Sequence, residues 1–133
     1  MSHHAKGTFE VKLVPQSVTH TELAESIGRM SIDKKFVGDL TGSSLGEMLS
    51  AMGTVKGSAG YVAIEKVTGS LQGKTGTFCL QHTGVMNRGA PSLVVTVIPD
   101  SGTGELAGLS GTLTIKIENK QHYYEFEYML PAS

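Results

Sequence analysis

The sequence predicts an all-β domain, a small antiparallel eight-stranded up-and-down barrel. Most of the chain divides into segments in which apolar and polar residues alternate, and turn residues separate these segments every dozen or so positions. The 17 glycines are spread along the chain instead of gathered in a linker, and glycine within strands is typical of the tight bends of a curved sheet. Strands that follow one another through short turns are expected to be neighbours in space.

The first two expected strands cover residues 6–14, which Pro15 ends, and residues 27–37. In both segments every second residue is apolar, as in a strand with one buried face. The apolar residues of these faces are Phe9, Val11, Leu13, Met30, Ile32 and Phe36.

Residues 39–52 admit a strand or a helix. A capping box from Ser44 to Glu47 favours a helix, as do apolar residues at helical spacing: Leu45, Met48, Leu49 and Met52. Glycines every fourth residue, at positions 38, 42 and 46, weaken a helix and share one face of a strand. A strand also brings the number of strands to eight, which closes a small barrel. We therefore prefer the strand, with the helix as the alternative.

The chain is organised around residues 57–84, which predict two long strands joined at Gln72–Gly73. In this register partner numbers sum to 145, so that Val67 faces Phe78. One face then carries Tyr61, Ala63, Glu65, Val67, Phe78, Leu80 and His82, and the other Val62, Ile64, Lys66, Thr68, Thr77, Cys79, Gln81 and Thr83. Neither face is cleanly polar, so we expect both to be at least partly covered.

The C-terminal part predicts three further strands. Residues 85–92 are expected to be a turn-rich connection, and residues 93–98 a strand that is apolar, and therefore buried, on both faces. Residues 105–118 and 121–130 predict a hairpin whose partner numbers sum to 239, which makes one of its faces apolar and the other polar.

Composition limits the classes of partner. The net charge is −1 and only 17% of residues are charged, so neither a nucleic acid nor a membrane surface is expected as a partner. Cys79 is the only cysteine, which excludes an internal disulfide. No apolar run has the length of a membrane span or resembles the core of a signal peptide, so a cytoplasmic location is expected. A chain of 133 residues predicts one domain, residues 1–133, with residues 1–5 flexible.

Two further patterns predict no cofactor and no metal. Residues 102–107, GTGELA, match the dinucleotide fingerprint, but the glycine-interrupted segment after them does not supply the helix that receives the pyrophosphate. We interpret them as a turn. None of the histidines within the predicted strands has the spacing of a metal site; the histidines are His3, His4, His20, His82 and His122.

Glu65 and His82 are the candidate catalytic residues. The predicted register makes them diagonal neighbours on one face, where their side chains could interact. A carboxylate beside an imidazole in an apolar enclosure could orient the ring and shift both pKa values toward neutrality, which suits an acid–base pair. The alternatives are a satisfied polar contact between strands, or a Glu65 that reaches solvent at the barrel rim. The candidate ligand-binding residues are Tyr61, Glu65, Leu80 and His82.

Residues 61–66, 69–74 and 76–84, with residues 104–111 and 122–124, resemble an uncharacterised bacterial family, a domain of unknown function. The resemblance implies an eight-stranded barrel similar to that of plant allene oxide cyclase, which is lipocalin-like. Allene oxide cyclase closes a fatty-acid epoxide inside its barrel, but none of its catalytic residues can be carried onto this chain. The resemblance therefore implies a fold and no activity.

Three functions remain open. The first is binding of a small apolar or amphipathic molecule in a barrel cavity, with Tyr61, Glu65 and His82 as polar anchors. The second is a cyclase or isomerase in which Glu65 and His82 form an acid–base pair. The third is a packed barrel that acts only through its outer surface, as a homodimer.

Overall fold

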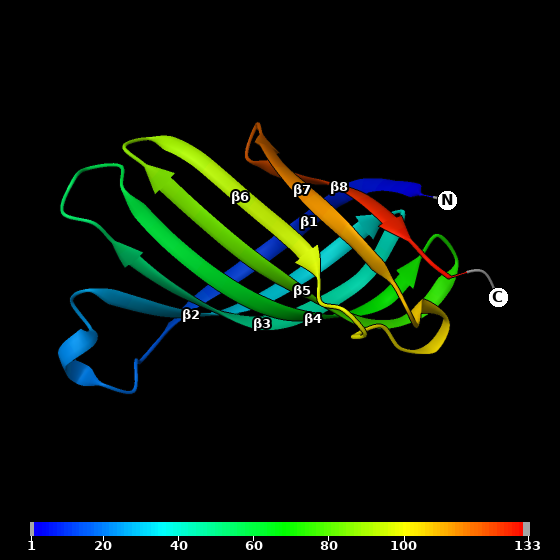
Figure 1. The fold of residues 1–133 in the computed structure, drawn as a ribbon, viewed down its shortest axis with the longest axis horizontal. Coiled ribbons are helices and arrows are strands. Elements are labelled where there is room, and N and C mark those ends of the chain that lie inside the picture. The colour runs from blue at the N-terminus through cyan, green and yellow to red at the C-terminus, as the bar shows by residue number, and fades with distance from the viewer. Residues whose placement is uncertain (1, 132–133) are drawn as a thin grey trace.

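The structure, a computed structural model, describes residues 2–131. Its strands form a closed barrel in which each strand pairs antiparallel with the next and β1 pairs with β8 (Figure 1). The predicted all-β, eight-stranded up-and-down barrel is therefore confirmed. The strands are β1 (His3–Gln16), β2 (Ile27–Gly38), β3 (Leu40–Met52), β4 (Ala59–Leu71), β5 (Lys74–Asn87), β6 (Ala90–Val97), β7 (Ser110–Glu118) and β8 (Gln121–Met129). Two short 3-10 helices, η1 (Thr21–Leu23) and η2 (Gly104–Leu106), lie in connections.

Both predicted hairpin registers are confirmed. Val67 pairs with Phe78 in the β4–β5 hairpin, and Ile117 pairs with His122 in the β7–β8 hairpin. The two central residues of each turn have positive φ: 47° and 88° at Gln72 and Gly73, 52° and 64° at Asn119 and Lys120. This left-handed conformation at both positions matches the right-handed twist of paired strands, which fixes the register.

Residues 40–52 form strand β3, so the helical alternative is wrong. Neighbouring backbones approach this strand closely at its glycines. A Cβ atom at Gly46 would lie 2.2 Å from the Ile64 carbonyl oxygen, and one at Gly42 would lie 2.2 Å from the Thr68 carbonyl oxygen. The glycine spacing that weakens a helix therefore serves close strand packing, and pairing with β2 and β4 determines the conformation.

Four predictions about strand limits, burial and the N-terminal residues differ from the structure. Residues 85–92 are not a connection, because β5 extends to Asn87 and β6 begins at Ala90, with only Arg88 and Gly89 between them. Residue Val94 of β6 is 55% exposed, so this strand is not buried on both faces. Pro15 does not end β1, which continues to Gln16. Proline is tolerated there because the β1–β8 pairing covers only residues 3–9, which leaves one edge of β1 without a partner at Pro15. Residues 3–5, expected to be flexible, belong to β1 and pair with β8.

One end of the barrel is filled by large buried side chains, and we call it the sealed end. This end carries the β4–β5 turn, η2, the first residues of β1 and the last residues of β8 (Figure 1). The Tyr124 hydroxyl accepts a hydrogen bond from the Leu40 backbone N–H at 2.8 Å and so ties β8 to β3 across the interior. The fully or almost fully buried side chains here are Leu40, Leu71, Phe78, Leu106, Leu109, Tyr124, Phe126 and Tyr128.

The opposite end, which we call the open end, carries η1, the loop of residues 53–58 and the β5–β6 turn (Figure 1). Strand pairing is incomplete toward this end, because β6 and β7 pair only through Thr96 and Thr112. Side chains that continue the inward alternation are exposed here: Leu13, Met52, Met86, Leu93 and Ile117. Within residues 2–131, no helix has the length and apolar character needed to cross a membrane.

Candidate functional site

A buried polar network, Lys34, Ser44, Glu65 and His82, lies in the barrel interior between the two ends. Four consecutive strands, β2 to β5, contribute one residue each. The Glu65 carboxylate is fully buried and lies at the centre of the network. Its Oε1 accepts a hydrogen bond from Ser44 Oγ at 2.7 Å, and its Oε2 accepts from Lys34 Nζ at 2.7 Å and from His82 Nε2 at 2.5 Å.

The network keeps Glu65 ionised. Burial alone raises the pKa of Glu65, but hydrogen bonds from His82, Lys34 and Ser44, together with the Lys34 charge, outweigh burial and lower that pKa to about 2. The predicted shift toward neutrality is therefore wrong for Glu65, and so is the alternative in which Glu65 reaches solvent at the rim. Lys34 Nζ also lies 4.8 Å from the centre of the Phe9 ring, which helps to cover the ammonium group.

His82 connects the network to Tyr61. An ionised carboxylate can only accept hydrogen bonds, so His82 Nε2 carries the proton that points at Glu65. The other ring nitrogen, Nδ1, lies 3.4 Å from the Tyr61 hydroxyl. Burial, and secondarily the Glu65 charge, raise the pKa of Tyr61, so its phenol stays protonated at neutral pH. A chain of polar contacts thus runs from Glu65 through His82 to Tyr61.

Gly84 leaves space for Tyr61. The two residues are paired across β4 and β5. A Cβ atom at position 84 would lie 2.3 Å from Cε1 of the Tyr61 ring. Any larger residue would push the ring out of its place, so this glycine sets the position of the phenol.

Tyr61 also lines an apolar cavity at the open end, which we call the mouth cavity. Its volume is about 310 Å³. Most of its lining residues occupy the same alternate strand positions as Glu65 and His82, which places the cavity on the inner side of β3 to β6. The lining consists of Met48, Ser50, Ala59, Gly60, Tyr61, Gly84, Val85, Met86, Pro91, Ser92 and Leu93.

The structure brings together three of the four predicted ligand-binding residues. Glu65 and His82 are hydrogen-bonded, as the register predicts, and Tyr61 is next to His82. Leu80 pairs with Glu65 across the hairpin but is fully buried in the core, away from the mouth cavity.

Sequence reasoning missed Lys34 and Ser44. The signal for Lys34 was present: it stands between Ile32 and Phe36, on the face that alternation assigns to the interior. A charged residue on a buried face needs an opposite charge, and Glu65 is the partner. Ser44 carries no such signal, because serine is uncharged and is found mostly on protein surfaces.

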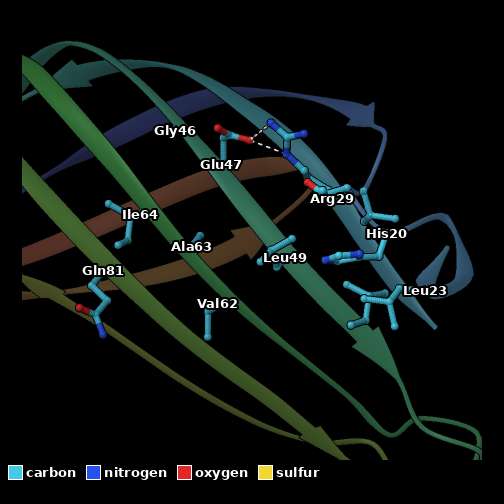
Figure 2. A pocket seen from close by; sticks show the side chains of 13 residues that line it. His20, Leu23, Arg29, Gly46, Glu47, Leu49, Val62, Ala63, Ile64 and Gln81 are labelled. Atoms are coloured by element: carbon cyan, nitrogen blue, oxygen red, sulfur yellow. Dashed lines mark hydrogen bonds and ion pairs between the residues drawn. The ribbon is translucent and has the colours of Figure 1, made fainter.

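A second concave region, which we call the outer groove, lies on the outer side of strands β2 to β5 (Figure 2). It has a volume of about 830 Å³ and is bordered by η1 and its flanking loop. An ion pair between Arg29 Nη2 and Glu47 Oε1, 2.6 Å long, crosses it. Val62 and Ile64 are 52% and 54% exposed here. The prediction that this face is partly covered is confirmed only toward the sealed end, where Ser101 and Thr103 contact the backbone of Cys79 and Thr77, whose side chains are half-buried. Residues 2–131 hold no group of three or more metal-ligating side chains.

Together these features define a closed antiparallel β-barrel with a buried ionic network beneath an apolar mouth. The chain belongs to the DUF3224 family, described as proteins of unknown function, and the family model matches residues 5–128. It is similar to a protein of unknown function from the same family from Shewanella oneidensis MR-1, whose crystal structure is known at 1.84 Å resolution. The two share 50% sequence identity with a TM-score of 0.93, over 100% of each chain. No curated protein matches the chain. The resemblance to a family of unknown function is thus confirmed; the likeness to allene oxide cyclase and the lipocalins stays a prediction.

Proposed function

We propose that the barrel binds one small molecule with an apolar body in the mouth cavity. The observation that carries this proposal is the contrast between the sealed end, which is filled by the core, and the open end, which leaves an apolar cavity with one phenol at its wall. Ligand cavities are commonly about 300–1,000 Å³, so a volume of about 310 Å³ selects a small ligand.

Native mass spectrometry of the freshly purified protein, compared with its denatured mass, tests this proposal. A stoichiometric excess mass that is lost on denaturation supports it. For protein without a bound molecule, a thermal-shift series from hexanol to decanol provides the second test, and a rise in Tm is expected. Leu93→Arg places a charge in the mouth cavity and should abolish the rise. Its neighbour Val94 points outward, so Val94→Arg is the matched control and should keep it. An unchanged Tm across the series contradicts the proposal.

A second candidate is an enzyme that moves a proton on an apolar substrate, such as a cyclase or isomerase. The contact chain from Glu65 through His82 to Tyr61 favours it, because a carboxylate that orients an imidazole toward a phenol is suited to general acid–base catalysis. Glu65 would be a positioning residue here, since three donors already occupy its oxygens. Deuterium exchange beside the carbonyl of a small ketone, followed by NMR, should be accelerated by the native protein and not by His82→Gln. Equal rates would remove this candidate.

We also propose that two copies associate through the outer face of β3 to β6. Exposed apolar side chains gather on this face: Leu45, Leu49, Val62, Ile64, Val85 and Val94. Arg29 of the adjacent strand β2 pairs with Glu47 (Figure 2), and Lys66 is the other charged side chain of this face. A two-fold axis that keeps the two Lys66 side chains apart brings no like charges together. Light scattering coupled to size exclusion should show a dimer that Ile64→Lys converts to a monomer. A native protein that is monomeric at all concentrations contradicts this association.

A further inference from the structure

Of the polar groups around the network, the Tyr61 hydroxyl is the one that can meet a ligand. Glu65, His82, Ser44 and Lys34 are all buried, and each oxygen of Glu65 already accepts a hydrogen bond from within the network. Tyr61 both lines the mouth cavity and contacts His82. Ser50 and Ser92 also line the cavity, but Tyr61 is the lining residue that contacts the buried network, so protonation of that network changes what the phenol offers a ligand.

The protonation state of His82 decides what the phenol offers. With a neutral imidazole, Nδ1 is an acceptor and takes the single Tyr61 proton, so the phenol presents only lone pairs to the cavity. With a protonated imidazole, Nδ1 donates to the Tyr61 oxygen, and the phenol proton turns toward the cavity. Protonation of His82 thus converts Tyr61 from an acceptor into a donor for the ligand.

Charge balance points the same way. The titratable groups that face His82 are Glu65 and Tyr61 on β4 and, across Glu65, Lys34 on β2; its β6 partner is the uncharged Val95. When His82 is neutral, the charges of Lys34 and Glu65 cancel. An anion bound in the cavity would then lack a compensating positive charge, and an uncompensated charge is costly in an apolar site. A protonated His82 supplies that charge.

We propose that the ligand is a small apolar molecule with one carboxylate, which accepts a hydrogen bond from Tyr61, and that its binding takes up one proton from solvent onto His82 Nδ1. The proton balance is complete, because the Tyr61 proton turns from Nδ1 to the ligand while Nδ1 gains the proton from water. This inference rests on the proposed binding function and adds to it the class of ligand and a coupling to pH. Histidine suits such a coupling, since imidazoles change charge between about pH 5 and 8.

Calorimetric titration of the intact protein with octanoate and with 1-octanol, at several pH values above 6.5, tests the inference. Octanoate is ionised in solution over this range, so the proton is taken up either by the protein or by the bound carboxylate. A pH dependence that persists in His82→Gln would assign it to the carboxylate and overturn the inference. We expect its Kd to rise about tenfold per pH unit where His82 is neutral, as the uptake of one proton requires, while the Kd of 1-octanol stays constant. Titrations in buffers of different ionisation enthalpy should count one proton for octanoate and none for 1-octanol.

Two variants separate the hydrogen bond from Tyr61 to the ligand from the uptake of a proton by His82. Tyr61→Phe removes one oxygen and leaves the buried network intact; it should weaken octanoate at least tenfold and leave 1-octanol unchanged. His82→Gln should remove the pH dependence, and its Tm reports whether the fold survives. Octanoate binding that is independent of pH, or equal in Tyr61→Phe, overturns the inference while the binding function stands. Failure of both ligands to bind overturns the binding function together with the inference.

Discussion

The two ends of the barrel are built from the same strands, with side chains alternating inward in the same way, but they differ in what those side chains do. At the sealed end, inward positions carry rigid, fully buried residues such as Leu71 and Phe78, and η2 adds Leu106 beneath them. At the open end, the same alternation carries flexible side chains such as Met48 and Met86 around the mouth cavity. The buried polar network lies between them. The difference teaches that the buried core fills one half of the barrel and leaves the other half open, where we propose that a ligand binds.

The largest expected effect on stability comes from disrupting the buried polar network, which lies between the two ends. Glu65→Ala leaves the Lys34 ammonium buried without a partner, so we expect a loss of about 3–5 kcal/mol in the free energy of unfolding. Urea denaturation measures it. Glu47→Ala is the matched control, because Glu47 pairs with Arg29 on the surface with 59% of its side chain exposed; such pairs are worth about 0–1 kcal/mol. A loss below 1 kcal/mol for Glu65→Ala would show that the network does not hold the barrel together.

Truncation of one leucine at each end tests the comparison directly. Leu71 is fully buried at the sealed end, and Leu93 is 42% exposed at the open end. Leu71→Ala should lower the free energy of unfolding by about 2–5 kcal/mol through lost burial and a cavity, and Leu93→Ala by less than about 1 kcal/mol. Equal losses at the two positions would mean that the open end is packed as well as the sealed end.

Acid should weaken the native protein through Glu65. Its folded-state pKa of about 2 lies below its ordinary value of 4.5, so the unfolded chain binds more protons between these two pH values. The stability that Glu65 contributes is complete above pH 4.5 and declines as pH falls toward 2, with a loss of about 1–3 kcal/mol. Urea midpoints measured across this range should fall more steeply for the native protein than for Glu65→Gln. Parallel slopes would assign the acid sensitivity to other carboxylates.

The smallest expected effect is that of Tyr61→Phe on stability. The contact from the Tyr61 hydroxyl to His82 Nδ1 is long, at 3.4 Å, and the ring is retained. We expect a change of about 0.5–1 kcal/mol or less in the free energy of unfolding. A Tm scan checks it, and a change of several kcal/mol would place Tyr61 in the stabilising half of the barrel.

The strands and their registers could be predicted from the sequence because the β4–β5 and β7–β8 hairpins encode them twice, in alternation and in turn chemistry. Positions 72 and 73 fix one turn, and the apolar row through Leu113, Ile115 and Ile117 fixes the other register. The course of β6 was harder to predict. Its segment is apolar on both faces, and alternation cannot show that Val94 faces solvent.

The site was predicted only in part, for a physical reason. Glu65 and His82 lie on one hairpin, so a local register brings them together. Lys34 and Ser44 approach Glu65 from strands β2 and β3, and their convergence depends on barrel closure, which no local pattern specifies. The pKa of Glu65 is lowered by hydrogen bonds from His82, Lys34 and Ser44 and by the Lys34 charge. The sequence placed only His82 beside Glu65, so the predicted direction of this pKa shift was wrong.

Methyl-resolved NMR during a titration with 1-octanol tests most directly whether the open end is the binding half. We predict saturable shifts of the Met48 and Met86 methyl signals, with Leu71 and Leu106 unmoved, because the first two line the mouth cavity and the others fill the sealed end. Shifts confined to Val62 and Ile64 would place the ligand in the outer groove instead, and would contradict binding inside the barrel.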